Sequence, residues 1–320
     1  MKKFTKLALA ASVAFSANAM AMQAMDDASL SATTGQDGLT IGIGISKIEI
    51  EKLYIHDNDG YAGAGGSGDA GAIYIQGNGA GVTANHGVVI GANYDNGGAY
   101  LLPTRNLADL VIDSDAGDSA TGGAFINIAA AVSGLDIHIG EVGVAASAAV
   151  PGTTAASIRR GAVANSENAI LTGLSVKTGP LAANIQLGAA PQGAMIKLNA
   201  TMVGGLTINN LGILDNSTKT ATREAGEIFI EQIQLADAGS RDLILNQNIS
   251  VIGEDTVSGD TGYVRIISTS GAHDNYVKGI HLGSQNAASI GDMEVQGLQT
   301  YFSPAMGVYT PGAIITIRGH

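Results

Sequence analysis

The stretches GAFINIAAAVSGLDI (residues 123–137) and GAMIKLNATMVGGLTI (residues 193–208) match along their whole length once one glycine is inserted in the first. Each begins with glycine, continues as a short apolar run, and reaches a second run that starts with Gly-Leu. Short apolar runs bounded by Gly, Asn, Asp and Ser are typical of β-strands joined by turns. The pair therefore predicts short strands that meet at glycine corners.

The same pattern recurs along the chain. Glycine-led apolar runs occupy residues 71–75, 123–128, 193–198, 226–233, 262–267 and 312–317, and Gly-Leu or Gly-Ile runs occupy residues 38–43, 134–139, 173–176, 205–208, 279–282 and 297–300. A further echo joins DLVID (109–113) to DLILN (242–246). The uneven spacing excludes a strict short-period array. It favours an all-β fold, an irregular β-solenoid of stacked short strands, with a multi-sheet β-sandwich as the alternative because strand runs alone do not fix strand order.

Apolar side chains change parity early in the chain. Leu39, Ile41, Ile43 and Ile45 share one parity, residues 48 and 50 take the other, and residues 53 and 55 return to the first. A single flat strand keeps one parity, because a slip of one residue turns every side chain to the opposite face. We therefore expect bends near residues 46–47 and at residue 52. Glycine- and alanine-rich stretches at 60–71 and 144–154 predict loops or subdomain boundaries.

Composition describes a folded, cysteine-free protein. The chain has 45 glycines, 6 prolines, no tryptophan and no cysteine, while hydrophobic residues make up 45%. That apolar content excludes a disordered chain. Lack of cysteine excludes disulfides, thiolate catalysis and cysteine-based metal sites, so stability must come from burial and backbone hydrogen bonds.

The amino terminus predicts export. Residues 1–21 combine three lysines, the apolar run LALAASVAF and the small-residue tail SANAMA, which is the arrangement of a cleavable secretory signal ending at Ala21. Its apolar run is shorter than a membrane span requires, so no transmembrane span is expected. The mature chain then has 13 basic against 28 acidic residues, a net charge of −15. Nucleic acid and anionic lipid are excluded as partners, because both need clustered basic residues.

No catalytic motif stands out, so the sequence predicts a protein that is not an enzyme and has no cofactor. Two acidic loops, HDNDG (56–60) and DSDAGD (113–118), space carboxylates as calcium often requires, which makes calcium candidates of Asp57, Asp59, Asp113, Asp115 and Asp118. Turns stabilised by their own Asp and Asn side chains explain both loops equally well.

The segment MDDASLSATTGQDGLTI (25–41) carries a family likeness. An acidic pair, a Leu-Ser and a Gly-Gln-Asp-Gly-Leu run lead into a strand, through Asp26, Asp27, Leu30, Ser31, Gly35, Gln36, Asp37, Gly38 and Leu39. This resembles the amino-terminal signature of a secreted gammaproteobacterial family with an uncharacterised domain. The whole chain resembles the FilA-type pilus assembly proteins of Acinetobacter. The resemblance implies a pilus-associated or cell-surface role and brings no catalytic residue with it.

These observations divide the chain into a signal peptide (1–21), an amino-terminal motif with the first strands (22–60) and a glycine-rich β body (61–320). We expect a secreted, non-enzymatic surface protein that is a structural or assembly component of a pilus or fimbria. Its partners would be other pilus or surface proteins, with self-association through strand edges. The alternatives are a calcium-stabilised adhesin passenger and a carbohydrate-active β-solenoid enzyme. The strand after residue 38 is the docking candidate, unless it only caps the protein's own first edge.

Overall fold

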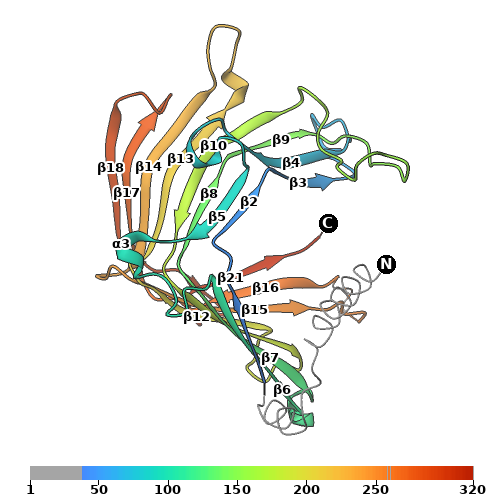
Figure 1. The fold of residues 1–320 in the computed structure, drawn as a ribbon, viewed down its shortest axis with the longest axis vertical. Coiled ribbons are helices and arrows are strands. Elements are labelled where there is room, and N and C mark those ends of the chain that lie inside the picture. Colours follow the sequence, from blue (N-terminus) through green and yellow to red (C-terminus); the bar gives the residue numbers. More distant parts are fainter. Residues whose placement is uncertain (1–37, 258, 260, 320) are drawn as a thin grey trace, which may run out of the picture. The chain divides into compact units, whose positions relative to one another are not determined.

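The computed structural model describes residues 38–257, 259 and 261–319. The chain is all-β, as its sequence predicts, and most strands belong to two sheets, A and B (Figure 1). Every pair whose register is defined is antiparallel, including the central pairs of both sheets. The predicted solenoid is therefore not confirmed, and two antiparallel sheets stand nearer to the sandwich alternative.

Sheet A has eight strands. In spatial order they are β1 (Leu39–Ile43), β6 (Ala108–Asp115), β7 (Phe125–Val132), β11 (Leu181–Gly188), β12 (Ile196–Met202), β15 (Leu243–Ile252), β16 (Tyr263–Ser268) and β21 (Ala313–Ile317). The order in space is also the order in sequence. Among the described residues, β1 and β21 are the two edges of this sheet.

Sheet B has eleven strands. Its main path runs through β2 (Lys47–Ile50), β5 (Val88–Ala92), β8 (Leu135–Ile139), β10 (Asn168–Lys177), β13 (Leu206–Asp215), β14 (Gly226–Asp237), β17 (His273–Leu282) and β18 (Ser289–Leu298). A branch adds β3 (Lys52–Asp57), β4 (Gly71–Gln76) and β9 (Glu141–Ala146), with β9 also paired to β10. Short elements complete the fold: β19 (Tyr301–Phe302), β20 (Thr310–Pro311), α3 (Asp95–Gly98), η1 (Gly81–Thr83), η2 (Ser119–Thr121) and η3 (Asn216–Thr218).

The branch strands continue the main strands of sheet B across short breaks. β2 and β3 are separated by Glu51, β5 follows β4 after residues 77–87, and β8 and β9 are separated by Gly140. Backbone hydrogen bonds cross the break line, since Gly87 donates to Glu51 at 2.9 Å and Gly140 donates to Gly87 at 2.8 Å. β2 with β3 and β8 with β9 are therefore each one bent strand, whereas β4 and β5 are joined by the segment 77–87, which contains η1.

We call a stretch of chain that crosses from one sheet to the other a pass. The described chain is then a single meander of long, bent passes. Each pass supplies one strand to sheet A and one to sheet B, and neighbouring passes run in opposite directions. The passes in order are β1 to β2/β3, β4/β5 to β6, β7 to β8/β9, β10 to β11, β12 to β13, β14 to β15, β16 to β17, and β18 to β21. Sheet A has eight strands, one from each pass, so there are eight passes.

Glycine and small polar residues form the corners where a pass leaves one sheet for the other. Between β7 and β8, Ser133 is fully buried; its hydroxyl donates to Asn106 O at 2.6 Å and accepts from Leu102 N at 3.0 Å. The next residue, Gly134, lies so close to its surroundings that a Cβ would approach Thr178 O to 2.6 Å. Between β12 and β13, Gly204 and Gly205 have φ of 83° and 76°, which glycine adopts without strain.

One apolar row crosses each sheet. In sheet A, seven isoleucines occupy successive register positions: Ile112, Ile128, Ile185, Ile196, Ile249, Ile266 and Ile315. In sheet B the row contains Ile48, Ile90, Ile137, Val176, Ile208, Ile233, Val277 and Met293. Side chains opposite each other on neighbouring strands pack together and stabilise the sheet.

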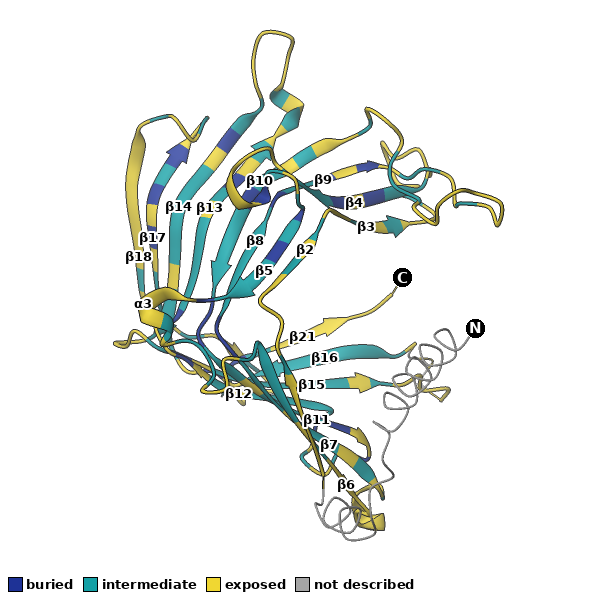
Figure 2. Ribbon diagram, in the orientation of Figure 1, coloured by how far each residue is buried: buried dark blue, intermediate teal, exposed yellow. Residues whose placement is uncertain are grey.

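Most side chains of both rows are of intermediate burial, like much of the two sheets in Figure 2. Of all these side chains only Val277 is buried, and Ile315 and Met293, at the ends of the rows, are 52% and 48% exposed. The largest side chain that is fully buried among the described residues is Tyr74, which is 1% exposed. The described part of the chain therefore leaves the apolar face of each sheet only partly covered.

The expected bends and loops occur close to the predicted positions, although the second bend lies at Glu51, one residue before the predicted one, and residues 144–146 still belong to β9. β1 ends at Ile43 and β2 begins at Lys47, and the next break separates Ile50 from Lys52. Residues 58–70 form the loop between β3 and β4, and residues 147–167 lie between β9 and β10 without a named strand. The predicted signal peptide lies outside the described residues.

Candidate docking edges

Of the family-motif residues, only Gly38 and Leu39 fall within the described part of the chain, and residues 26–37 lie outside it. Gly38 is exposed and has φ of 112°, a left-handed conformation that favours glycine. Leu39 begins β1 and is 56% exposed. The motif therefore leads directly into an edge strand.

Strand β1 has the sequence LTIGI and carries no charge. Its neighbour in sheet A is β6, and near its end Leu107 N donates to Ile43 O at 2.9 Å. Gly42 permits this close approach, because a Cβ there would lie 2.5 Å from Asn106 Nδ2. Ile41 is 37% exposed. The first edge of sheet A is therefore apolar and partly open to solvent.

Strand β21, at the opposite edge of sheet A, is also uncharged, with the sequence AIITI. It pairs in register with β16, and Ile314, Ile315 and Ile317 are 43%, 52% and 55% exposed. Just beyond it, the Arg318 guanidinium lies 4.6 Å from the centre of the Tyr263 ring on β16, which is cation–π geometry. Proteins commonly protect an exposed edge with charges, proline or bulges. Within the described residues, neither β1 nor β21 contains a charge or a proline.

The edges of sheet B are different. β2 alternates charge with isoleucine, and its Lys47 Nζ lies 2.6 Å from Glu49 Oε1. This hydrogen bond, with the charge of the same lysine, holds the pKa of Glu49 below its usual value. β18 is bulged against β17 at several positions and carries Asp292 and Glu294. Charges and bulges of this kind hinder pairing with another chain.

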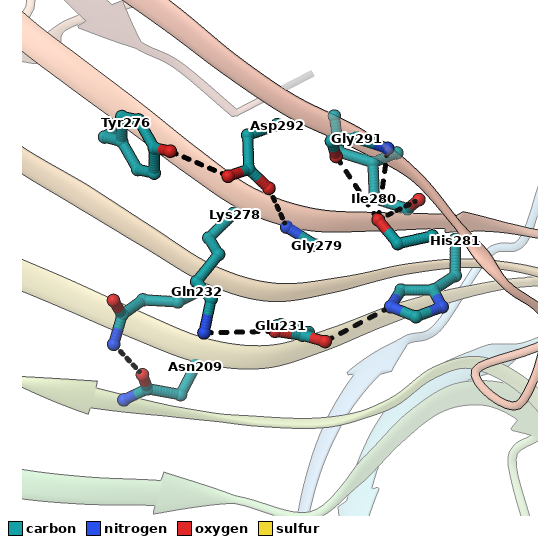
Figure 3. A network of polar contacts seen from close by, with 11 residues as sticks. Asn209, Glu231, Gln232, Tyr276, Lys278, Gly279, Ile280, His281, Gly291 and Asp292 are labelled. Carbon is teal, nitrogen blue, oxygen red and sulfur yellow. Dashed lines mark hydrogen bonds and ion pairs between the residues drawn. The ribbon is translucent and has the colours of Figure 1, made fainter.

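Asp292 is tied to the strand beneath it (Figure 3). Gly279 N donates to its Oδ1 at 2.8 Å and the Tyr276 hydroxyl donates to its Oδ2 at 2.7 Å. These two donors lower the pKa of Asp292, because they stabilise its charged form. Gly279 has φ of 64°, and a Cβ there would meet Glu231 at 2.4 Å. Gly279 therefore adopts its left-handed conformation without strain, and its lack of a side chain leaves room for Glu231 on the neighbouring strand.

A second group of contacts in Figure 3 connects β14 to β17. Glu231 lies 3.4 Å from both Lys278 Nζ and His281 Nε2. The second ring nitrogen of His281 lies 2.6 Å from Ala287 O, in the turn before β18. The last strand of sheet B is therefore anchored through its turn as well as through Asp292.

The calcium candidates do not gather around one point. Asp57, Asp115 and Asp118 each accept a backbone N–H two residues ahead, from Asp59, Gly117 and Ala120, which is the geometry of an Asp-stabilised turn. Asp113 lies within β6, two residues before Asp115. Across the described ranges, no three His, Cys, Asp or Glu side chains come together as a metal site would need. Because the turns use these carboxylates, we expect a chelator to leave the melting temperature unchanged.

A polar hollow of about 660 Å³ lies at the outer part of sheet B, a feature that the sequence did not mark. Among its lining residues are Glu141, Glu227 and Arg223. Glu141 accepts from the buried Tyr74 hydroxyl at 2.8 Å; burial and this hydrogen bond both raise the pKa of Tyr74. Glu227, 8% exposed, accepts from Gln285 N at 2.8 Å. Both glutamates thus hold neighbouring segments in place.

The comparisons with known proteins add one family. A family of unknown function (DUF6160) matches residues 1–100, which include the motif and the first strands. No curated protein and no solved structure matches the chain. In the part of the chain that the structure describes, no helix is both long and apolar enough to cross a membrane.

Proposed function

We propose that this protein is exported by its signal peptide and serves at the cell surface as a non-enzymatic structural or assembly component of a pilus or fimbria. Support comes from the secretory pattern of residues 1–21, the net charge of −15 in the mature chain, the resemblance of residues 25–41 to a secreted family with an uncharacterised domain, and the resemblance of the whole chain to FilA-type pilus assembly proteins. The partners would be other pilus or surface proteins.

The observation that carries this proposal is the position of β1. The strand that follows the family motif lies at an edge of sheet A, uncharged and partly exposed. An exposed edge can take up a strand from a partner, with main-chain hydrogen bonds giving affinity and alternate side chains giving register. Sheet A ends at β1 and β21, and among the described residues each of these strands has a hydrogen-bonded neighbour on one side alone.

Immunogold labelling of cells and sheared filaments tests this role. We expect label at the cell surface and on filaments when the chain carries a small epitope tag after residue 320. Label confined to the cell interior, or absent from cells and filaments alike, would overturn the proposal.

Deletion of residues 25–45 tests the docking strand itself. The shortened chain should be secreted with the circular dichroism spectrum of a β protein, yet it should not join filaments. Loss of folding would mean instead that β1 only caps the protein's own sheet, because an uncovered edge tends to aggregate. A matched control removes the loop residues 62–67, which lie between β3 and β4 and belong to neither sheet.

The hollow in sheet B supports a second candidate, a carbohydrate-active enzyme. It combines carboxylates with Lys219 and Arg223 in one cavity, and paired carboxylates hydrolyse glycosides. Incubation of the purified chain with acidic and neutral polysaccharides should release reducing sugar if this candidate holds. The release should disappear in Glu227→Gln and persist in the distant Glu294→Gln control. Equal rates for the two variants would remove this candidate.

A further inference from the structure

The first and last passes run in opposite directions. The first pass goes from β1 in sheet A to β2 in sheet B, whereas the eighth goes from β18 in sheet B to β21 in sheet A. Every internal pair of passes has the same relation. A second copy placed beside the first without rotation therefore brings its first pass antiparallel to the last pass of its neighbour. An odd number of passes would make that junction parallel.

The edges of sheet A have matching chemistry for this junction. β1 and β21 are five residues long, uncharged and free of proline, and four consecutive residues of each are exposed. Full pairing of the two strands sets Ile41 of one copy opposite Ile315 of the next. Ile315 ends the isoleucine row of sheet A, so this pairing extends that row with another large aliphatic side chain.

In the same translation the edges of sheet B come side by side, although their charges and bulges make this the weaker of the two contacts. Met293 ends the apolar row of sheet B and Ile48 begins it, so the row continues when Ile48 of the next copy lies opposite Met293. That register places Lys47 opposite Glu294, a cross-strand pair of opposite charge, and Glu49 opposite Asp292, a pair of like charges that weakens the contact. Asp292, the nearest carboxylate to Glu294 on this strand, is bound by Tyr276 and Gly279.

We propose that copies of this chain stack head to tail, with β21 of one copy hydrogen-bonded to β1 of the next and with β18 beside β2. The partner is a second copy of the same chain. A heterologous contact that repeats by translation does not close, and it therefore produces an open filament. This assembly deepens the proposed surface function and rests on it for a role on the cell, while the pairing itself depends only on the fold.

Isologous pairing is the competing arrangement. If β1 paired with a second β1, or β21 with a second β21, the contact would close as a two-fold dimer, since a two-fold axis relates identical surfaces. The two arrangements differ in one respect that can be measured: only the head-to-tail contact brings residue 41 opposite residue 315.

Charge placement at those two positions tests the junction. The mature chain, residues 22–320, is prepared as wild type, as Ile41→Lys, as Ile315→Glu and as the double variant. Both isoleucines are at least a third exposed, and each variant is first checked for wild-type circular dichroism and melting temperature. Sedimentation velocity over a hundredfold range of concentration and negative-stain microscopy then follow assembly.

The head-to-tail contact predicts a specific set of results. Wild type forms species that lengthen with concentration, and each single variant is monomeric because a charge faces an isoleucine at every junction. The two single variants mixed together assemble again as alternating copies, and the double variant assembles alone, since lysine then faces glutamate. Higher salt weakens the double variant more than wild type, because its added pairs are exposed charges.

Other outcomes overturn the proposal. A wild-type chain that is monomeric throughout, a species that stops at a dimer, or equal aggregation of all four proteins would each do so. Failure of the surface role is recognised separately. A monomeric chain that still labels filaments on cells overturns the stacking alone, and a chain that stacks in solution but is absent from the cell surface overturns the surface role alone.

Discussion

The two sheets share the same passes but end in different ways. The edges of sheet A, β1 and β21, present apolar, uncharged strands, whereas the edges of sheet B carry Lys47, Glu49, Asp292 and Glu294. β18 is also bulged and hydrogen-bonded to β17 through Asp292, while β21 pairs with β16 in unbroken register. Sheet B thus has the features by which proteins discourage edge pairing, and sheet A lacks them. In the stack proposed above, the attraction between copies therefore comes from the edges of sheet A.

The largest expected effect lies in sheet B, at Tyr74, the largest fully buried side chain among the described residues. Tyr74→Ala should lower the free energy of unfolding by about 3–5 kcal/mol, the usual cost of removing a buried aromatic side chain. Tyr74→Phe is the control: it keeps the ring and removes the hydroxyl that donates to Glu141, so it should cost only about 1 kcal/mol. Urea denaturation of both variants measures the difference. Equal losses would mean that the hydrogen bond, and not the packing, stabilises this part of sheet B.

A smaller effect should separate the centre of sheet A from its edge. Ile185 is half-buried in the middle of the isoleucine row, and Ile315 is 52% exposed at its end. We expect Ile185→Ala to cost about 1–2 kcal/mol and Ile315→Ala to cost about half as much or less, in proportion to the apolar area each removes from water. The measurement is urea denaturation at a concentration where the chain is monomeric. An equal cost would show that the row is covered at its edge.

Acid should loosen the last strand of sheet B before that of sheet A. Gly279 and Tyr276 hold the pKa of Asp292 below its ordinary value of 3.8, and the backbone N–H groups of Gly239 and Gly297 do the same for Asp274. A carboxylate with a lowered pKa contributes stability above its unfolded pKa and loses it as the pH falls through the folded value. Both residues attach β18 or its end.

Amide hydrogen exchange at pH 5 and below pH 3 measures this loosening. Protection of β18 amides should fall in acid more than protection of β21 amides. Asp292→Asn should show reduced β18 protection already at pH 5 and a smaller change in acid. If β21 loses protection first, the carboxylates do not hold this edge.

Much of this fold could be predicted because its repeats are visible in the sequence. The matched stretches 123–137 and 193–208 are the third and fifth passes, β7 to β8 and β12 to β13, with the inserted glycine at the corner. DLVID and DLILN both begin sheet A strands of passes that come from sheet B, β6 and β15. The prediction of an all-β chain was therefore confirmed, whereas several strands are longer than predicted, such as β14 with 12 residues.

Strand order could not be predicted in the same way. The two longer echoes join passes that run in the same direction, the third with the fifth and the second with the sixth, while the glycine-led runs occur in passes of both directions. A repeated sequence indicates that two passes have the same local structure, but it does not indicate the direction of the pass between them. A stack of parallel coils and an antiparallel meander therefore produce the same pattern of sequence repeats. The polar hollow escaped prediction for a related reason, because Glu141 and Glu227 come from strands far apart in the sequence.

The smallest effect on folding, and the one that best separates stability from assembly, is expected at Lys47. Its ammonium pairs with Glu49, but the two side chains are 58% and 38% exposed, and exposed ion pairs contribute little to stability. Lys47→Met should therefore leave the urea denaturation midpoint unchanged.

In the head-to-tail stack, however, Lys47 faces Glu294 of the neighbouring copy, so the same change should slow assembly. Steered association depends on charge and weakens with salt. Light scattering at low salt should show slower assembly for Lys47→Met, and Glu294→Lys combined with Lys47→Glu should restore the rate, because the pair then has reversed charges. Unchanged assembly of Lys47→Met would remove sheet B from the junction and leave β1 and β21 as its only contact.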